Sequence, residues 1–288
     1  TAYGTQKKAS IVGAIQTVEP GNLEVGTSSR LSNNLAGQIA GVIAYKPSGE
    51  PGYDQSSFWI RGISSYTGTT TPLVLVDGIE RTLDDLDVEQ IESFSVLKDA
   101  SASAMYGVRG ANGVIVITTK RGKVGKPTVS VRVEQSLQAP TKLPKFASAA
   151  EDMELQNLLY AEANNGAYTW SPELIERTRN GYDPDLYPDV NWLDEMTDSF
   201  ASTINANFNI QGGTRFVKYF ASVGYAHEGS IFKGVNDGKI DSRYYYNRFN
   251  FRTNVDFNVT PTTVVSFKLG GNVGIKNKPQ PQDGDDGM

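Results

Sequence analysis

The sequence contains no cysteine and only one histidine, and these scarcities exclude several kinds of chemistry. Without cysteine there is no disulfide framework, no thiolate metal site and no cysteine nucleophile. A histidine-rich zinc site, or a serine hydrolase with a histidine base, would depend on His227 alone. We interpret His227, which follows an expected strand, as a loop histidine without a catalytic partner.

Long hydrophobic runs are also missing. Residues 73–76 and 114–117 are among the longest, far short of the roughly 18–20 residues of a membrane helix. With 27 Lys and Arg against 32 Asp and Glu, the net charge of −5 argues against a nucleic-acid-binding protein. No signal peptide is visible and the first residue is not Met, so we interpret the N-terminus as mature or truncated.

Glycine and proline are plentiful, with 29 and 13 residues, which favours a turn-rich β protein. Up to about residue 122, helix and strand patterns alternate. The apolar spacing predicts a helix from Leu31 to Ile39 that stops at Gly41, and Asp99 is expected to cap a helix over 100–106. Strands are predicted over 58–62, 73–76, 91–97 and 114–119. These elements indicate a small mixed α/β unit.

A polar insertion follows at about 139–200. Ser148 and Glu151 have the spacing of a capping box, and Ser171-Pro172 is typical of a second helix start. We therefore expect two helices here, the first ending near Gly166 and the second at Gly181, followed by an extended loop over 181–188.

Five later segments alternate apolar and polar residues: 129–134, 204–210, 219–225, 249–259 and 265–269. This pattern fits a soluble sandwich whose polar faces meet water, or a membrane barrel with its apolar side toward lipid. The length of the strands and the aromatic residues concentrated in 200–276 favour the barrel. The expected lipid-facing residues are Phe249, Phe251, Val255 and Phe257, and the lumen-facing ones are Asn250, Arg252, Asn254 and Asp256.

Five strands cannot close a barrel, because bacterial single-chain barrels have at least eight. We therefore expect this chain to be part of a longer polypeptide or one piece of a cleaved one.

Two segments carry a family resemblance. Residues 72–80, PLVLVDGIE, and 91–122, with the runs KDAS, YG and RGANGV, resemble the plug domain of SusC/RagA-type TonB-dependent transporters. Residues 59–62 resemble the plug's Ile-Arg-Gly element, and residues 3–8 with 12–15 resemble the start of the mature plug. Residues 183–188 and 191–192 resemble the first long insertion of the barrel region.

This resemblance implies an α+β plug domain followed by antiparallel transmembrane β-barrel strands, with the barrel incomplete in this chain. The expected domains are the plug domain, residues 1–125, and the N-terminal portion of the barrel, residues 126–288, with the insertion inside it. The TonB box is expected to be missing or reduced to Thr1-Ala2, and an N-terminal immunoglobulin-like extension to be absent.

Two loops, 48–57 and 81–87, resemble apical plug loops. Sugar recognition uses their mixture of groups, because aromatic rings stack on C–H faces while carboxylates and amides bridge hydroxyls. Ordinary polar loop chemistry is the alternative. The candidate substrate-binding residues are Glu50, Tyr53, Asp54, Gln55, Asp84 and Asp85.

The resemblance also implies a plug–barrel lock. In transporters of this type, the arginine matching Arg61 faces the barrel wall and pairs with carboxylates there; a solvated strand end is the alternative. Arg109 and Lys98 are candidates for a second lock cation.

Two further motifs are given structural interpretations. Gly107, Gly110 and Gly113 lack the spacing and the element order of a phosphate loop, so we interpret them as turn glycines. Residues 283–286 resemble a calcium loop but lack its twelfth-position glutamate, so we expect no metal site and interpret them as part of an extracellular loop.

The function implied is TonB-dependent nutrient import across the outer membrane of a Gram-negative bacterium, with oligosaccharides as the favoured substrate. Such a protein is not an enzyme and needs no cofactor. The implied partners are a SusD-like surface lipoprotein, TonB, the substrate and outer-membrane lipid, with no nucleic acid. Peptide import by the same family, or a soluble β-rich glycan-binding or adhesion module, are the alternatives.

Overall fold

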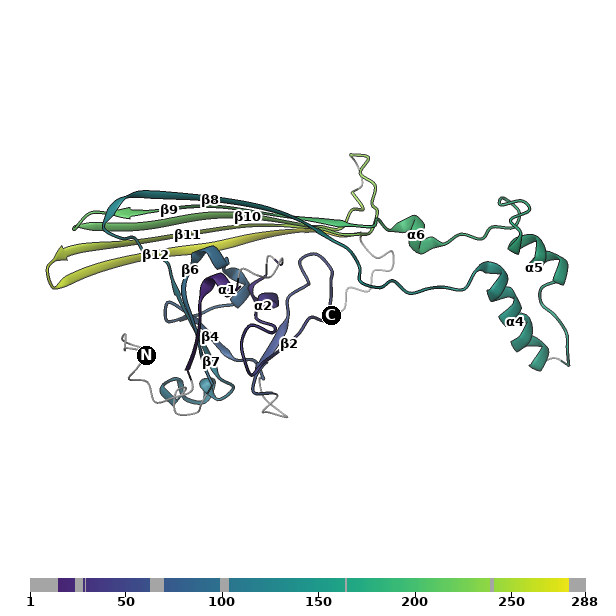
Figure 1. The fold of residues 1–288 in the computed structure, drawn as a ribbon, viewed down its shortest axis with the longest axis horizontal. Helices are drawn as coiled ribbons and strands as arrows, with labels where there is room; N and C mark the ends of the chain where they lie inside the picture. Colours follow the sequence, from purple (N-terminus) through teal and green to yellow (C-terminus); the bar gives the residue numbers. More distant parts are fainter. Residues whose placement is uncertain are drawn as a thin grey trace.

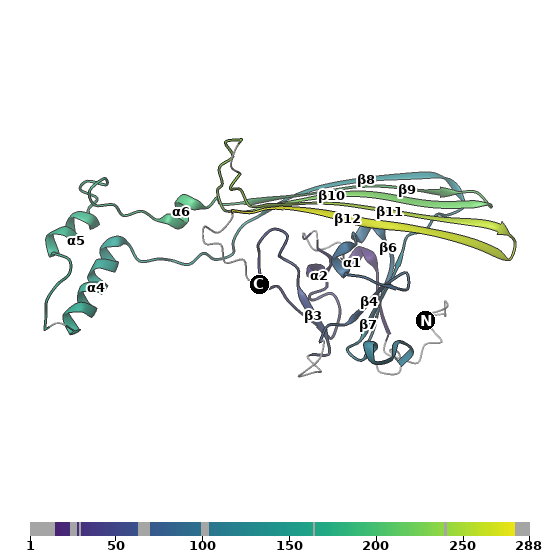
Figure 2. The same cartoon turned by 180° about the vertical axis from the view of Figure 1, so that it is seen from behind.

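The computed structural model describes residues 15–23, 28, 30–62, 70–98, 104–163, 165–238 and 241–279. Two five-stranded sheets dominate it, and a helical insertion extends beyond one end of the second sheet (Figures 1 and 2). We call the described residues from Ile15 to Lys120 the plug unit, and the second, longer sheet the long sheet. The plug unit lies against one face of the long sheet in both views.

The sheet of the plug unit has the strand order β1-β6-β7-β4-β5. Its strands are β1 (Ile15–Val18), β4 (Leu73–Val76), β5 (Ile79–Glu80), β6 (Ile91–Leu97) and β7 (Val114–Thr119). Only the β4–β7 pair is parallel, so the sheet is mixed. A separate antiparallel pair joins β2 (Val42–Tyr45) to β3 (Ser57–Ile60). The strands predicted at 58–62, 73–76, 91–97 and 114–119 are thereby confirmed.

Short helices cover one face of this sheet and complete its core. They are α1 (Pro20–Leu23), α2 (Leu31–Asn34) and the 3₁₀ helices η2 (Leu83–Asp85) and η3 (Val88–Gln90). Phe94, Ile115 and Ile117 pack there against leucines from the helices and the turns beside them, and all are buried. A smaller cluster on other strand positions packs Leu97 and Val114 against Tyr106 of η4 (Ala104–Gly110).

Both helices predicted in this unit are wrong in extent. The first ends at Asn34 rather than Ile39, because Ser32 and two asparagines are weak helix formers and Gly37 has a φ of 74°, which no right-handed helix accepts. Of the second, residues 99–103 lie outside the described residues. The part that follows is a 3₁₀ helix kinked at Gly107.

The long sheet is antiparallel throughout, in the order β12-β11-β10-β9-β8. Its strands are β8 (Gly125–Gln138), β9 (Ala201–Gly213), β10 (Val217–Gly229), β11 (Tyr245–Thr260) and β12 (Thr263–Asn277). All five predicted strands are confirmed, and each is longer than its alternating segment. Since this order lists every strand of the sheet once between two ends, the described strands form an open sheet and not a closed barrel.

The two ends of the long sheet differ in their connections. Residues 214–216 and 261–262 make short links at one end, whereas residues 139–200 and 230–244 make long ones at the other. We call the end with the long links the apical end. The chain passes from the plug unit into β8 at the opposite end, where Gly122 lies beside the backbone of Tyr219 in β10.

The insertion holds α4 (Ala149–Ala163), α5 (Pro172–Arg179) and α6 (Trp192–Met196). The capping box is confirmed: the Glu151 amide donates to Ser148 Oγ at 3.2 Å, and the Ser148 amide donates to Glu151 Oε2 at 2.9 Å. Ser171 caps α5 by accepting from the Leu174 amide at 3.2 Å, with Pro172 in the first turn. The short helix α6 was not predicted. Among the described residues, no helix is long and apolar enough to cross a membrane.

Candidate functional site

The candidate site is the interface between the plug unit and the long sheet. Strand β11 turns one row of side chains toward the plug unit, and these are buried although they are polar or charged: Arg248, Asn250, Arg252, Asn254 and Asp256. The alternate row is 43–48% exposed at Phe249, Phe251 and Phe257. This pattern agrees with the predicted assignment of the two faces of β11. The polar side chains of β11 are buried between the long sheet and the plug unit.

Small residues on neighbouring strands make room for this polar row. A Cβ atom added to Gly224 of β10 would lie 2.0 Å from Asn250 Oδ1 and 2.6 Å from Asn207 Oδ1. A larger residue at position 224 would therefore have to displace the amides that converge from β9 and β11 over β10.

Hydrogen bonds join the centre of the interface. Arg252 Nε donates to Gln90 Oε1 at 3.0 Å, and Asn254 Nδ2 donates to Thr119 Oγ1 at 2.8 Å and to the carbonyl of Lys120 at 2.7 Å. Arg248 Nη1 donates to the carbonyl of Asp84 at 2.6 Å. The plug unit is thus held by donors from β11 that meet its 3₁₀ helices η2 and η3 and the end of β7. Such contacts can be exchanged for water more readily than a packed apolar core can.

Ion pairs lie beside this centre, because Arg132 of β8 is in register with Asn250 of β11, and Lys268 of β12 is in register with Asn254. Glu89 of η3 pairs with Arg132 of β8 at 3.1 Å and with Lys120 at 3.6 Å. Lys268 of β12 lies 3.8 Å from Asp77, and Arg121 lies 3.8 Å from Asp256. Each is partly exposed to solvent, so each contributes modestly to stability.

At the apical end, a charged cluster joins both parts. Arg30 of the plug unit lies 3.3 Å from Asp54 and 3.9 Å from Glu228 of β10, and its guanidinium stacks 4.8 Å from the ring centre of Tyr246. Burial disfavours the charged form of Arg30, but the carboxylates of Glu228 and Asp54 outweigh it, so the pKa of Arg30 is raised. Arg30 is therefore a fixed positive charge between the two parts.

The predicted substrate-binding residues divide into two groups. Asp54 and Asp84 are buried and engaged inside the plug unit. Asp54 pairs with Arg30 and Lys46, whereas Asp84 accepts from the amide and the hydroxyl of Ser32, each at 2.8 Å. Burial raises the pKa of Asp84, while the bonds from Ser32 oppose that rise. These contacts give both carboxylates an architectural role.

The other four predicted residues lie at the surface or at the interface. Tyr53 and Gln55 are exposed. Glu50 pairs with Lys276 of β12 at 2.5 Å, and Asp85 accepts from Asn272 Nδ2 at 2.7 Å. Their role in substrate binding stays a prediction, and it now rests mainly on Tyr53 and Gln55.

The predicted lock residues lie at different places. Arg61 is exposed, has a φ of 61° and donates its amide to the carbonyl of Gly41. Arg109 pairs with Glu80 at 2.7 Å within the plug unit. Lys98 donates to Gln16 and to the carbonyl of Ala40, also within the plug unit, and burial and the nearby Arg61 lower its pKa. Their lock function stays a prediction.

Sequence reasoning turned Arg252 toward the inside of the sheet, but it named none of the cations that cross the interface, Arg30, Arg248 and Arg252, as a contact between the two parts. The signal for the two on β11 was present, because both lie on the polar face of an alternating strand. The signal for Arg30 was absent, since one arginine beside a short helix has no recognisable pattern.

Two remaining features do not form a reactive centre. His227 lies within β10, not in a loop as predicted, and its Nδ1 is 2.8 Å from Asn247 Oδ1. Among the described residues, no three His, Cys, Asp or Glu side chains gather as a metal site would require. The calcium-like loop at 283–286 lies outside the described residues.

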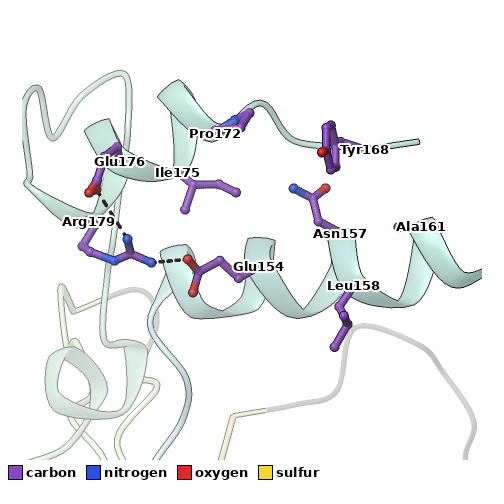
Figure 3. A pocket seen from close by; sticks show the side chains of 9 residues that line it. All are labelled: Glu154, Asn157, Leu158, Ala161, Tyr168, Pro172, Ile175, Glu176 and Arg179. Carbon is purple, nitrogen blue, oxygen red and sulfur yellow. Dashed lines mark hydrogen bonds and ion pairs between the residues drawn. The ribbon is translucent and has the colours of Figure 1, made fainter. Parts of the chain in front are cut away.

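A groove of about 530 Å³ lies between α4 and α5 in the insertion, away from the interface (Figure 3). Tyr168, Leu158 and Ile175 are among its lining residues. Arg179 of α5 pairs with Glu154 of α4, which joins the two helices, and also with Glu176 within α5.

The chain is similar to known proteins along most of its length. The TonB-dependent Receptor Plug Domain family matches residues 7–114. "TonB-dependent receptor P26" of Formosa agariphila is 33% identical over 274 residues, which are 93% of this chain and 26% of that protein. "TonB-dependent receptor SusC" of Bacteroides thetaiotaomicron is 30% identical over 268 residues, which are 89% of this chain and 25% of that protein.

A solved structure of a transporter has a similar fold. The structure of the RagAB peptide importer in its open-open state matches with a TM-score of 0.76 and 23% identity, over 96% of this chain and 32% of that one. The chain spans about a quarter of the length of the curated relatives it matches.

Proposed function

Because this chain belongs to the TonB-dependent receptors of the SusC/RagA type, we propose that it acts in the import of nutrients across the outer membrane of a Gram-negative bacterium. Residues 1–125 serve as the plug, and the strands of residues 126–288 form part of the barrel wall. Long extracellular loops and short periplasmic turns are the rule in such barrels. The apical end, with its long links, therefore faces outward.

The observation that carries this proposal is the contrast between the two faces of the long sheet. Its outer face is apolar, as lipid requires, and its inner face holds the plug by hydrogen bonds and ion pairs. A plug that must shift to open a path needs contacts that water can replace. The arrangement supports transport and gives no support to catalysis.

We propose oligosaccharides as the substrate class. Tyr53 offers an exposed ring at the apical end, and Gln55 and Glu50 offer an amide and a carboxylate beside it. Peptides are the second candidate, because the RagAB structure with a similar fold is described as a peptide importer. The proposed partners are TonB, which would pull on the plug, and a SusD-like surface lipoprotein at the apical end.

The test is uptake by the intact receptor. A strain lacking the receptor gene would be compared with its complemented form on fluorescent malto-oligosaccharides and on a fluorescent peptide mixture, with and without TonB. The proposal predicts TonB-dependent uptake of an oligosaccharide. TonB-dependent uptake of peptides alone would make the second candidate correct, and equal uptake without TonB would contradict the transport mechanism.

A further inference from the structure

Three strands of the long sheet contact the plug loop between β2 and β3 at the apical end. This loop carries Glu50 and Tyr53, and its contacts come from the ends of β10, β11 and β12, through Glu228, Tyr246 and Lys276. These three residues are far apart in the sequence, but antiparallel pairing brings them together: Glu228 is opposite Tyr246, and Tyr246 is opposite Lys276.

The first contact, at Gly52, involves the backbone of the loop. The Gly52 amide donates to Glu228 Oε2 at 3.1 Å. A Cβ atom at this position would lie 2.7 Å from Tyr246 Cδ2, and the φ of +75° is unfavourable for any other residue. The loop therefore approaches the wall as closely as its backbone allows, and glycine is needed for both reasons.

Lys276 makes the second contact. Its Nζ lies 2.5 Å from Glu50 Oε1 and 3.9 Å from the centre of the Tyr53 ring. An ammonium so close to an aromatic centre is bound by the electrostatic attraction of the ring face. One wall residue thus occupies the carboxylate of Glu50 and one face of Tyr53 together.

Charge is balanced around this loop. Arg30 and Lys46 supply the positive charges that compensate Glu228 and Asp54. The guanidinium of Arg30 lies over the ring of Tyr246, which Gly52 contacts. The wall residues Glu228 and Tyr246 therefore meet both the backbone of the loop and the buried arginine behind it. This double engagement couples the position of the loop to the core of the plug.

We propose that Glu228, Tyr246 and Lys276 form an apical clasp, which positions the plug loop carrying Glu50 and Tyr53 and covers one face of the Tyr53 ring until the clasp is released. The inference rests on the proposed function, because the positioned groups are those proposed to meet the substrate. Lys276 and a sugar compete for the same ring face and the same carboxylate. Opening the clasp is accordingly the step that links substrate arrival to movement of the plug.

The clasp can be tested without a substrate, by hydrogen exchange of the loop amides in the full-length receptor. Glu228→Gln keeps the size of the side chain but removes its charge, and Lys276→Met removes the ammonium. Each should speed the exchange of Gly52 and Tyr53 by roughly fivefold or more, because a charged partner is lost. Exchange in β6 and β7 should stay unchanged, which shows that the plug remains folded.

Lys278→Met is the matched control, because Lys278 is an exposed lysine two positions further along the chain. It should leave the loop amides as they are in the unmodified receptor. Unchanged exchange at Gly52 and Tyr53 in both clasp variants, or equal acceleration in Lys278→Met, would overturn the clasp. If the clasp variants exchange faster but the unmodified receptor takes up no oligosaccharide, the clasp is supported. Only the proposed substrate class is then contradicted.

Discussion

Asn254 shows how a single residue of the long sheet can hold the plug. Its amide donates to a threonine hydroxyl and to the carbonyl of Lys120, and its side chain is 2% exposed. An amide in such a place stabilises the interface only while its partners stay aligned, since a buried polar group without a partner is costly. These hydrogen bonds therefore stabilise one position of the plug against the long sheet, and their contribution is lost when the plug shifts.

Replacing this amide should weaken the seating of the plug. Asn254→Leu leaves two acceptors of the plug without this donor, so we expect the plug's free energy of unfolding to fall by about 1–3 kcal/mol. Hydrogen exchange of β7 amides in the full-length receptor measures it. Asn258→Leu on the same strand is the control, because the side chain of Asn258 donates to the carbonyl of Arg215, between β9 and β10, among the hydrogen bonds described. An equal effect of both variants would contradict the account.

Asp84 predicts a pH dependence. Its folded-state pKa lies above the ordinary value of 3.8, mainly through burial, so the folded plug binds this proton more tightly than the unfolded chain does. The contribution of Asp84 to stability should therefore fall as the pH rises from about 3.8 through the raised pKa. The measurement is the difference in unfolding free energy between the unmodified receptor and Asp84→Asn across this window. A difference that grows with pH would show that the pKa is lowered instead.

At the scale of elements, the strands of the long sheet were the easiest to predict and the short helices the hardest. A period of two sustained over five to eleven residues in five segments is a strong signal, because one slip exchanges the two faces of the strand. The capping residues Ser148 and Ser171 likewise predicted α4 and α5 through local hydrogen bonds. By contrast, α2 and η4 are held by tertiary packing, and α6 has only five residues. No capping residue or sequence period therefore predicted where these short helices begin and end.

Adjacent residues of β8 test which face meets lipid. Val131 is 67% exposed on the outer face, whereas Ser130 points inward, where its hydroxyl meets Asn209. Val131→Arg in the full-length receptor would put a cation into lipid, at about 2–4 kcal/mol near the bilayer midplane, and Ser130→Arg at the same depth would not. We expect much less folded receptor for Val131→Arg, measured by heat-modifiable migration of outer-membrane samples. Equal assembly of both variants would refute the face assignment.

At the scale of the whole molecule, the sequence predicted the parts better than their contacts. The plug and the strands followed from motifs and alternation, and the polar row of β11 was correctly turned inward. The partners of Arg30 and of Asp84 could not be predicted, because they come from residues 24 or more positions away, joined only by the fold. For the same reason, two carboxylates proposed to bind substrate turned out to be engaged inside the plug.

The central claim is that the plug sits against the wall through releasable polar contacts and must move for import. The most direct measurement is uptake by a full-length receptor in which Thr119→Cys and Asn254→Cys place one thiol on each side of the interface, where the native side chains meet at 2.8 Å. With the disulfide formed, TonB-dependent uptake should be lost, and a reductant should restore it, while each single-cysteine variant keeps its uptake under oxidant. Undiminished uptake by the fully cross-linked receptor would contradict the claim.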